Sequence, residues 1–253
     1  MKLQDSVMAI TGGGQGLGRA MAEHLASKGT KVALIDLMPE KLDEAVAACK
    51  AAGSEAKSYI CNVAKEEDVE KTFEAIIKDF GHLNGLINNA GILRDCLMVK
   101  AKECKVERRM ELSQWQAVID VNLTGVFLCG REAATQMIKN GDQGVIINIA
   151  SISRAGNMGQ SNYSAAKAGV SALVPVWARE LARHGIRCAG IAPGFIETEM
   201  TASMKPEALE KMIAGIPLKR MGQPEEIASA AAFIFENDYV SGRIIEVDGA
   251  LRL

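Results

Sequence analysis

The sequence predicts one doubly wound α/β domain spanning residues 1–253, in which a seven-stranded parallel sheet carries helices on both faces. Short apolar runs alternate with longer stretches of helical periodicity, which is the pattern of strands joined by helical crossovers. Glycines directly follow several of the helical stretches, as they do at helix C-termini. No repeat, low-complexity tract or linker divides the chain, and one α/β domain can reach ~250 residues.

The first half of the chain is expected to contain four of the strands. They are predicted over residues 7–11, 31–35, 55–60 and 85–88, and the helices between them over residues 15–28, 39–52 and 66–80. Gly29, Gly53 and Gly81 follow these helices and end them. Because strands linked by helices run parallel, and such crossovers are right-handed, the four strands belong to one sheet.

The second half continues the alternation after an interruption. Periodicity fails around a charged insertion at about residues 99–110, which we expect to form an exposed loop or a short solvated helix. Strands are predicted over residues 144–151, 186–192 and 243–247, and helices over residues 113–140, 160–183 and 224–236. The irregular segment at about residues 195–216 is expected to form a substrate loop with short helices.

Composition is that of an ordinary globular protein. Apolar residues make up 48% and charged residues 24%, and the net charge is −2 with the signs interspersed, so neither nucleic acid nor membrane is an expected partner. No apolar run reaches the ~18–20 residues of a membrane-spanning helix, and the N-terminus lacks a signal-peptide pattern, so we expect a cytoplasmic location. Six cysteines without C-x-x-C pairs read as free thiols, and three scattered histidines indicate no metal site.

A glycine-rich turn follows the first strand and opens the first helix. Glycines at positions 12, 16 and 18 permit a tight turn and a close approach of the backbone to a pyrophosphate, which the helix N-terminus attracts. A purely structural turn is the alternative. The strand–turn–helix context, with an acid at position 36, favours dinucleotide binding and a Rossmann-like fold. The expected contacts are Gly12, Gln15, Gly16, Leu17 and Gly18.

Asp36, at the end of the second strand, indicates which dinucleotide. A carboxylate there can accept hydrogen bonds from both adenosine ribose hydroxyls of NAD, and it repels the 2′-phosphate of NADP. The turn carries Gln15 where a phosphate-pairing cation could stand, and Arg19 is the nearest cation. We therefore expect NAD(H) to be preferred over NADP(H). A helix-capping role near Pro39 is the alternative for Asp36, and it is compatible with cofactor binding.

Tyr163 and Lys167 stand four positions apart at the head of a predicted helix, so they lie on one face. A solvated lysine over a half-buried tyrosine is the alternative. Ser151 ends the fifth predicted strand, where its hydroxyl can donate to a substrate carbonyl beside the tyrosine, and Ser153 is its rival. No His–acid order and no G-x-S-x-G turn accompany these serines, so a hydrolase is not expected.

Together these features resemble the classical short-chain dehydrogenase/reductase family. The resemblance covers essentially the whole chain and rests on residues 11–18 and 88–91, Asn122, Ser151, Tyr163, Lys167, Pro193 and Gly194. Residues 94–98, 193–200 and 216–227 are most similar to the 3-oxoacyl-acyl-carrier-protein (β-ketoacyl) reductases of that family.

The resemblance implies catalytic roles for four residues. Tyr163 would be the general acid in ketone reduction, and Lys167 would lower the pKa of its phenol and hold the nicotinamide ribose. Ser151 would orient the carbonyl oxygen, and Asn122 would support a water chain that supplies protons, although a residue that merely bends a helix is the alternative. Further cofactor contacts are implied at Asn62, Val63, Asn89, Ala90, Gly91, Pro193, Gly194, Ile196 and Thr198. Asn62 stands where the family usually has Asp.

The expected reaction is NAD(H)-dependent reduction of a 3-oxoacyl thioester, on acyl-carrier protein or CoA, to the 3-hydroxyacyl form. A dehydrogenase of another small or cyclic secondary alcohol is the alternative, and a non-catalytic NAD(H)-sensing protein is a remote one. Residues 139–143 are nearly neutral where carrier-docking cations are usual, whereas the cations of residues 100–109 could meet a phosphorylated substrate or nothing. The resemblance also implies a homotetramer, built through the long helices 113–140 and 160–183.

Overall fold

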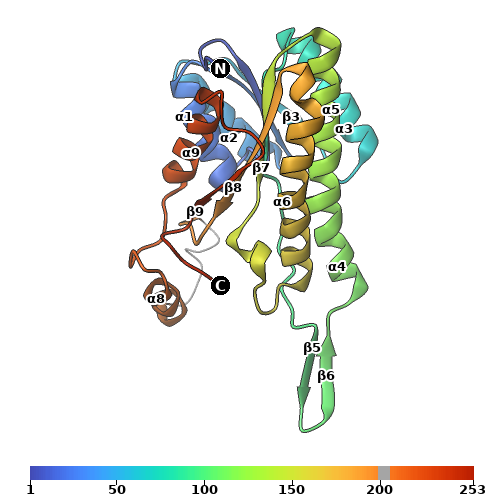
Figure 1. Cartoon of the computed structure of the whole chain (residues 1–253), viewed down its shortest axis with the longest axis vertical. Coiled ribbons are helices and arrows are strands. Elements are labelled where there is room, and N and C mark those ends of the chain that lie inside the picture. The colour runs from blue at the N-terminus through green and yellow to red at the C-terminus, as the bar shows by residue number, and fades with distance from the viewer. Residues whose placement is uncertain (199–205) are drawn as a thin grey trace.

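A parallel β-sheet forms the centre of the molecule, as the sequence predicts (Figure 1). The computed structural model describes residues 1–198 and 206–253. Within them the strands of this sheet are β1 (Val7–Thr11), β2 (Lys31–Asp36), β3 (Ala56–Ile60), β4 (Gly85–Asn88), β7 (Gly144–Ile149), β8 (Ile186–Pro193) and β9 (Ile244–Val247). These seven strands pair in the order β3-β2-β1-β4-β7-β8-β9, and every pairing is parallel.

Helices cover both faces of the sheet (Figure 1). One face carries α1 (Gly16–Ser27), α2 (Pro39–Ala51) and α9 (Pro224–Glu236), and the other carries α3 (Glu66–Phe80), α5 (Gly125–Asn140) and α6 (Ser161–Leu181). Successive residues of β1 point to opposite faces, so Met8 and Ile10 pack in the core beside α1, whereas Val7 and Ala9 pack in the core beside α3. The apolar runs of the sequence are therefore strands buried on both sides.

The strand order reverses direction between β1 and β4. The chain builds outward from β1 through β2 to β3, and then returns to place β4 on the other side of β1. In open α/β sheets, ligands bind at such a switch point, outside the carboxyl ends of the strands. A ligand site is therefore expected among the residues that follow β1, β4 and β7.

The long helix expected over residues 113–140 is interrupted. It consists of α4 (Leu112–Ile119), a π-helical turn (Asp120–Thr124) and α5. Glu111 and Gln114 form a capping box at the start of α4. The π turn contains Asn122, whose side chain bonds to a neighbouring backbone, and π turns of this kind are frequent at functional sites.

The charged insertion forms a β-hairpin, so the expected loop or short helix is wrong. It pairs β5 (Val99–Lys102) with β6 (Lys105–Arg109) in antiparallel fashion, and it projects from the molecule at the end where α4 begins (Figure 1). The connecting residues Glu103 and Cys104 both have positive φ, +48° and +64°. That is the geometry of a type I′ hairpin turn, which usually uses Asn and Gly.

Within its described residues the predicted substrate loop contains the helix α8 (Pro206–Gly215), and its residues 199–205 lie outside the described part of the chain. Phe195 and Met212 pack around a small core that contains Ile152, Ile216 and Leu251. This core joins the substrate loop to the C-terminal tail and to the segment that follows Ser151.

Among the described residues, no helix is long and apolar enough to cross a membrane.

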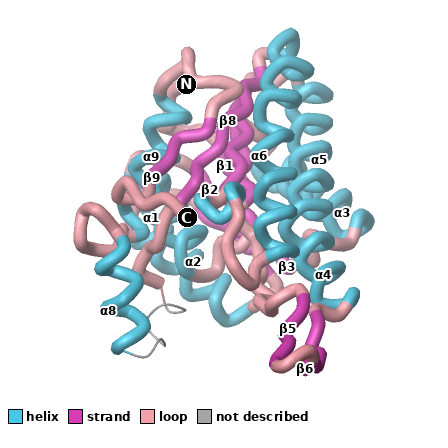
Figure 2. Tube along the Cα trace, turned by 60° about the horizontal axis from the view of Figure 1, so that its bottom comes forward, coloured by secondary structure: helices cyan, strands magenta, loops and turns pink. Residues whose placement is uncertain are grey.

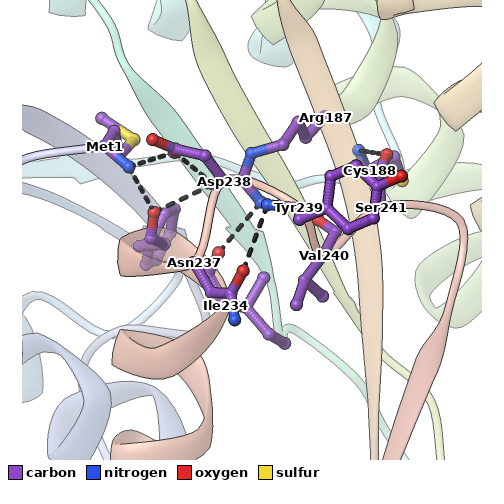
Figure 3. A network of polar contacts seen from close by, with 10 residues as sticks. Met1, Arg187, Cys188, Ile234, Asn237, Asp238, Tyr239, Val240 and Ser241 are labelled. Carbon is purple, nitrogen blue, oxygen red and sulfur yellow. Dashed lines mark hydrogen bonds and ion pairs between the residues drawn. The ribbon is translucent and has the colours of Figure 1, made fainter.

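Arg187 fastens β8 to the end of α9 (Figure 3). Its guanidinium donates hydrogen bonds to the main-chain oxygens of Ile234 (2.9 Å), Phe235 (2.9 Å) and Val240 (2.7 Å). The last carbonyls of a helix lack intrahelical donors, so the guanidinium satisfies groups that would otherwise be unpaired. The terminal ammonium of Met1 also bonds to Phe235 and to Asp238.

Candidate active site

A cavity of about 600 Å³ opens at the carboxyl ends of the strands around the switch point. It is lined by every predicted site residue except Gly18 and Asn122, namely Gly12, Gln15, Gly16, Leu17, Asp36, Asn62, Val63, Asn89, Ala90, Gly91, Ser151, Tyr163, Lys167, Pro193, Gly194, Ile196 and Thr198. Residues from six of the seven strand ends of the sheet therefore meet in one place. The size and the mixed polar and apolar lining are typical of a cofactor-and-substrate cleft.

The glycine-rich turn forms one wall of this cavity through Gly12, Gln15, Gly16 and Leu17. A Cβ on Gly18 would lie 2.0 Å from the carbonyl oxygen of Gly12, and one on Gly12 would lie 3.0 Å from the Cα of Ala90. Gly18 is thus needed for the packing of the turn although it does not line the cavity. Gln15 precedes α1, and no side chain among the described residues caps the first N–H groups of this helix. These N–H groups suit a pyrophosphate.

Thr11 and Asn89 lock the glycine turn to the end of β4. The Thr11 hydroxyl accepts hydrogen bonds from the N–H groups of Asn89 and Ala90, each 3.0 Å long. The Asn89 amide donates in return to the carbonyl oxygens of Thr11 and Gly12, each at 3.1 Å. The side chain of Asn89 therefore holds the turn rather than reaching into the cavity. Sequence reasoning missed Thr11, whose only signal is its place directly before the glycines.

Asp36 is held beside the glycine turn by backbone donors. Its carboxylate accepts a hydrogen bond from the N–H of Gly14 at 3.1 Å and from the N–H of Leu37 at 2.7 Å. It does not cap α2, whose N-cap is Met38, so the capping alternative is wrong. Arg19 is engaged by Glu23 at 2.7 Å and lies outside the cavity wall. Among the described lining residues, the charged ones are Asp36 and Lys167.

Tyr163 and Lys167 occupy the first two turns of α6 and face the cavity together. The Lys167 ammonium donates a 2.6 Å hydrogen bond to the carbonyl oxygen of Ile149 and lies 5.7 Å from the centre of the Tyr163 ring. Only 3% of Lys167 is exposed, so the alternative of a solvated lysine is wrong. A lysine is rarely buried in this way unless it serves a site.

Asn162 fixes the start of α6 and was missed from the sequence, although it directly precedes Tyr163. It is fully buried, and its side-chain oxygen accepts a hydrogen bond from the Tyr163 N–H at 2.8 Å. Its amide group donates to the carbonyl oxygens of Arg94 (3.2 Å) and Gln114 (3.1 Å). The helix that carries the tyrosine is thereby tied to α4 and to the segment that precedes the hairpin.

Burial shifts both of these ionisable groups toward their neutral forms. It lowers the pKa of Lys167 to about 8 from an ordinary value of 10.5. Burial also raises the pKa of Tyr163, against the opposing effect of a hydrogen bond with Ser151, and Asp95 raises it further. Together these effects raise the pKa of Tyr163 in the protein by itself, and the lowering that the resemblance implies for Lys167 stays a prediction. A phenol is protonated at neutral pH, as a general acid must be.

Ser151 lines the cavity, whereas Ser153 is buried and is not among the described lining residues. The Ser151 hydroxyl accepts a 3.1 Å hydrogen bond from the N–H of Ser153. The hydroxyl also lies close enough to Tyr163 for a hydrogen bond that lowers the pKa of the phenol. Of the two serines weighed from the sequence, the structure places the preferred one beside the tyrosine.

Asn122 lies behind the cavity wall. Its side-chain oxygen accepts a hydrogen bond from the N–H of Ile92 at 2.8 Å, and its amide donates to the carbonyl oxygen of Ile92 at 3.0 Å. Asn122 is fully buried, and Gly91 packs against it. Its side chain therefore positions the segment after β4, which does line the cavity. Its part in proton supply stays a prediction.

The cysteines and carboxylates give no sign of metal chemistry in the part of the chain that the structure describes. No group of three His, Cys, Asp or Glu side chains in those ranges lies close enough together to hold a metal ion. All six cysteines are free thiols, and burial raises the pKa of Cys49 to about 11 and that of Cys188 to about 12. Such thiols are poor nucleophiles near neutral pH.

Comparison with known proteins shows which families this chain is similar to. A family model described as Enoyl-(Acyl carrier protein) reductase matches residues 12–251. The 3-oxoacyl-(acyl-carrier-protein) reductase of Thermotoga maritima is 39% identical over 254 residues, covering 99% of both chains. That of Synechocystis sp. is 40% identical over 254 residues, covering 98% of both chains. A solved structure titled Crystal Structure of Levodione Reductase has a TM-score of 0.88 and 36% identity over 97% of each chain.

Proposed function

The chain belongs to the short-chain dehydrogenase/reductase family, an oxidoreductase family that uses a nicotinamide cofactor, and we propose that it reduces 3-oxoacyl thioesters with NADH. One observation carries this proposal. A phenol, a buried ammonium and a serine hydroxyl converge beside the glycine-rich turn, in a chain about 40% identical to 3-oxoacyl-(acyl-carrier-protein) reductases over nearly its whole length.

The residues of the cavity fit a dinucleotide. Gly12 and Gly18 let the turn pack closely on itself and on Ala90, and the first N–H groups of α1, which no described side chain caps, suit a pyrophosphate. In this proposal Asp36 accepts hydrogen bonds from the adenosine ribose hydroxyls, and Lys167 binds the nicotinamide ribose. The carboxamide of the nicotinamide is bound by Ile196 and Thr198. When bound, NADH supplies the hydride that reduces the ketone.

The side chains of the site then handle the carbonyl oxygen. Tyr163, protonated at neutral pH as an ordinary phenol is, donates its phenolic proton to that oxygen. Ser151 donates a second hydrogen bond to the same oxygen, which stabilises the negative charge that develops there. Lys167 is held by the carbonyl of Ile149 within reach of the phenol, so its ammonium can favour the phenolate that remains.

The substrate can be tested with a panel of ketones and NADH. We expect the highest kcat/KM with 3-oxobutanoyl thioesters of acyl-carrier protein or CoA. A cyclic diketone is the second candidate, because a solved reductase with such a substrate in its title has a TM-score of 0.88 to this chain. A trans-2-enoyl thioester covers the activity named by the family model. Faster turnover of the cyclic diketone or of the enoyl thioester would overturn the proposed substrate.

The cofactor preference depends on Asp36. We expect a higher kcat/KM with NADH than with NADPH, since the carboxylate repels a 2′-phosphate and the described lining residues near it include no cation. The double variant Asp36→Ala/Leu37→Arg removes the carboxylate and places a guanidinium at an exposed lining position. It should shift the NADH/NADPH ratio of kcat/KM by about 100-fold toward NADPH, or ~2.7 kcal/mol. Asp36→Asn, which removes only the charge, should give a smaller shift.

This prediction has two independent ways to fail. A native enzyme that is more efficient with NADPH would show that the carboxylate does not meet the ribose. An unchanged ratio in the double variant would show that the preference originates elsewhere in the cavity.

We also propose that the chain assembles as a homotetramer. Large apolar side chains are exposed on the outer helices, with Leu112 at 77%, Phe127 at 44% and Val176 at 46% exposure. Apolar side chains of this size gather at subunit interfaces more often than on free surfaces. Light scattering should give about four times the chain mass of 27.0 kDa. The mass of a single chain would rule the assembly out.

A further inference from the structure

The β5–β6 hairpin has one cationic face. In an antiparallel pair, residues directly opposite each other point to the same side, and neighbours along a strand alternate. Lys100 is opposite Arg108, and Lys102 is opposite Lys105. These four residues therefore share one face, whereas Val99, Ala101, Val106 and Arg109 share the other. We call the four cations, Lys100, Lys102, Lys105 and Arg108, the cationic face.

The cationic face is exposed and mostly unpaired. Every residue of both strands is exposed. Glu107, displaced by the register shift in the hairpin, forms a 2.8 Å ion pair with Lys100. Among the described residues, Lys102, Lys105 and Arg108 form no ion pair. The whole chain has a net charge of −2, so this concentration of positive charge is local to the hairpin.

The arrangement weakens the hairpin that carries it. Like charges directly opposite each other across a β-pair are destabilising, and both cross-strand pairs of this face are like-charged. A two-stranded hairpin in water is only marginally stable, and this one also has a turn without glycine. An anionic partner would remove the repulsion. Stability of the free protein therefore gives no reason for this pattern of charges.

The root of the hairpin is fixed to the active site. Leu93 lines the cavity, and three residues later Cys96 forms a β-bridge with Gln160, at the start of α6. The N–H of Cys96 donates to the carbonyl oxygen of Gly159 at 2.8 Å, and the amide of Gln160 donates to Asp95 at 2.8 Å. The hairpin and α8 project from the same end of the molecule, at opposite sides of the strand ends (Figure 2).

We propose that the cationic face is the docking surface for an acidic carrier protein that presents the thioester to the cavity. This inference rests on the proposed function and specifies the form in which the substrate arrives. The four cations are spread over two strands, with successive residues of one face about 6.8 Å apart along each strand. Directly opposed residues lie about 5 Å apart, so the four cations form a two-by-two array. The similar reductases of Thermotoga maritima and Synechocystis sp. are named for an acyl-carrier protein, so we assign this array to the carboxylates of a carrier rather than to the phosphates of CoA. Complementary charge chiefly speeds and orients such encounters.

The test uses a variant that should strengthen the hairpin while it removes docking. Lys102→Glu/Arg108→Glu turns both like-charged pairs into pairs of opposite charge, so the hairpin gains stability and the face loses its net positive charge. The matched control is Lys71→Glu/Lys78→Glu, two exposed positions on α3 with the same change in total charge. Each protein is assayed with 3-oxobutanoyl thioesters of acyl-carrier protein, CoA and pantetheine, and titrated with holo acyl-carrier protein in a binding assay.

For the hairpin variant, we expect kcat/KM with the carrier-protein thioester to fall at least tenfold, through KM, while the pantetheine thioester and the control variant are unaffected. Raising the salt concentration should lower the kcat/KM of the native protein with the carrier-protein thioester, because salt screens the attraction between the two proteins. Equal carrier affinity in native and variant proteins would overturn the proposal. If kcat/KM falls equally with the CoA thioester, the cationic face binds the CoA nucleotide instead of a carrier protein. If kcat/KM falls equally with all three thioesters, the hairpin stabilises the active site and is not a docking surface. If the native protein reduces no thioester, the proposed function fails, and the binding titration still decides whether the carrier docks.

Discussion

Replacing Tyr163 by phenylalanine is expected to lower kcat for ketone reduction by about 10²–10⁴-fold. The variant keeps the ring that lines the cavity and loses only the hydroxyl that donates the proton. NADH affinity should stay within about twofold, because general acid catalysis acts on the transition state rather than on cofactor binding. Stopped-flow absorbance at the nicotinamide band measures the chemical step, and fluorescence titration measures the affinity.

A matched control is Tyr239→Phe, since the side chain of Tyr239 is fully exposed at 101% and lies on the turn after α9. This variant should retain native kcat. If Tyr163→Phe reduces the ketone at the native rate with unchanged cofactor affinity, the proton comes from another group and the catalytic assignment is wrong.

Lys167→Met should separate activity from stability. The variant keeps most of the volume of the side chain but loses the ammonium, so we expect kcat/KM to fall by at least about 100-fold. The folded protein holds Lys167 with a pKa near 8, whereas the unfolded chain titrates it near 10.5. Between these values the unfolded state binds more protons, so the native protein gains stability as pH rises. The variant lacks this dependence.

Urea unfolding of both proteins between pH 7 and pH 10.5 measures the difference. Below pH 8 the buried charge penalises the native protein, and this penalty should fade as pH rises through the interval, by up to about 3 kcal/mol. Other groups that titrate in the same range are common to both proteins and cancel in the comparison. If the difference in free energy of unfolding between the two proteins stays constant with pH, the pKa of Lys167 is not lowered in the folded protein.

Much of the fold follows from local patterns in the sequence. The doubly buried strands read as apolar runs, and the glycines after α1 and α3 end these helices in the left-handed conformation. The carboxyl ends of parallel strands converge at a switch point, so Asp36 and Ser151 could be assigned to one cleft before the structure was known. The four-residue spacing of Tyr163 and Lys167 needed only helix geometry.

The hairpin could not be predicted in the same way. Glu103 and Cys104 adopt positive φ without the Asn or Gly that normally announces such a turn, so the usual turn signal is absent. The only signal was the alternation of apolar and charged residues over Val99–Lys102. A pattern of four residues is too short to outweigh the density of charge, which favoured a loop or a solvated helix.

The site also contains features that depend on long-range packing. The roles of Thr11 and Asn162 arise from backbone groups far away in the sequence, such as the N–H of Ala90 and the carbonyl of Gln114. The pKa of Tyr163 depends on how deeply the cavity buries it, which the sequence does not show. A spacing rule identifies which side chains meet, whereas desolvation depends on the complete surroundings.

The central claim is that hydride passes directly from the nicotinamide to the carbonyl carbon of a 3-oxoacyl thioester in this cavity. The most direct measurement uses NADH deuterated at both C4 positions, 3-oxobutanoyl thioester in ordinary water, and mass spectrometry of the product. We predict a 3-hydroxybutanoyl thioester that carries one deuterium at C3, formed in equal amount to the NAD⁺ produced. A product without deuterium, or oxidation of NADH without formation of the 3-hydroxy product, would contradict the account.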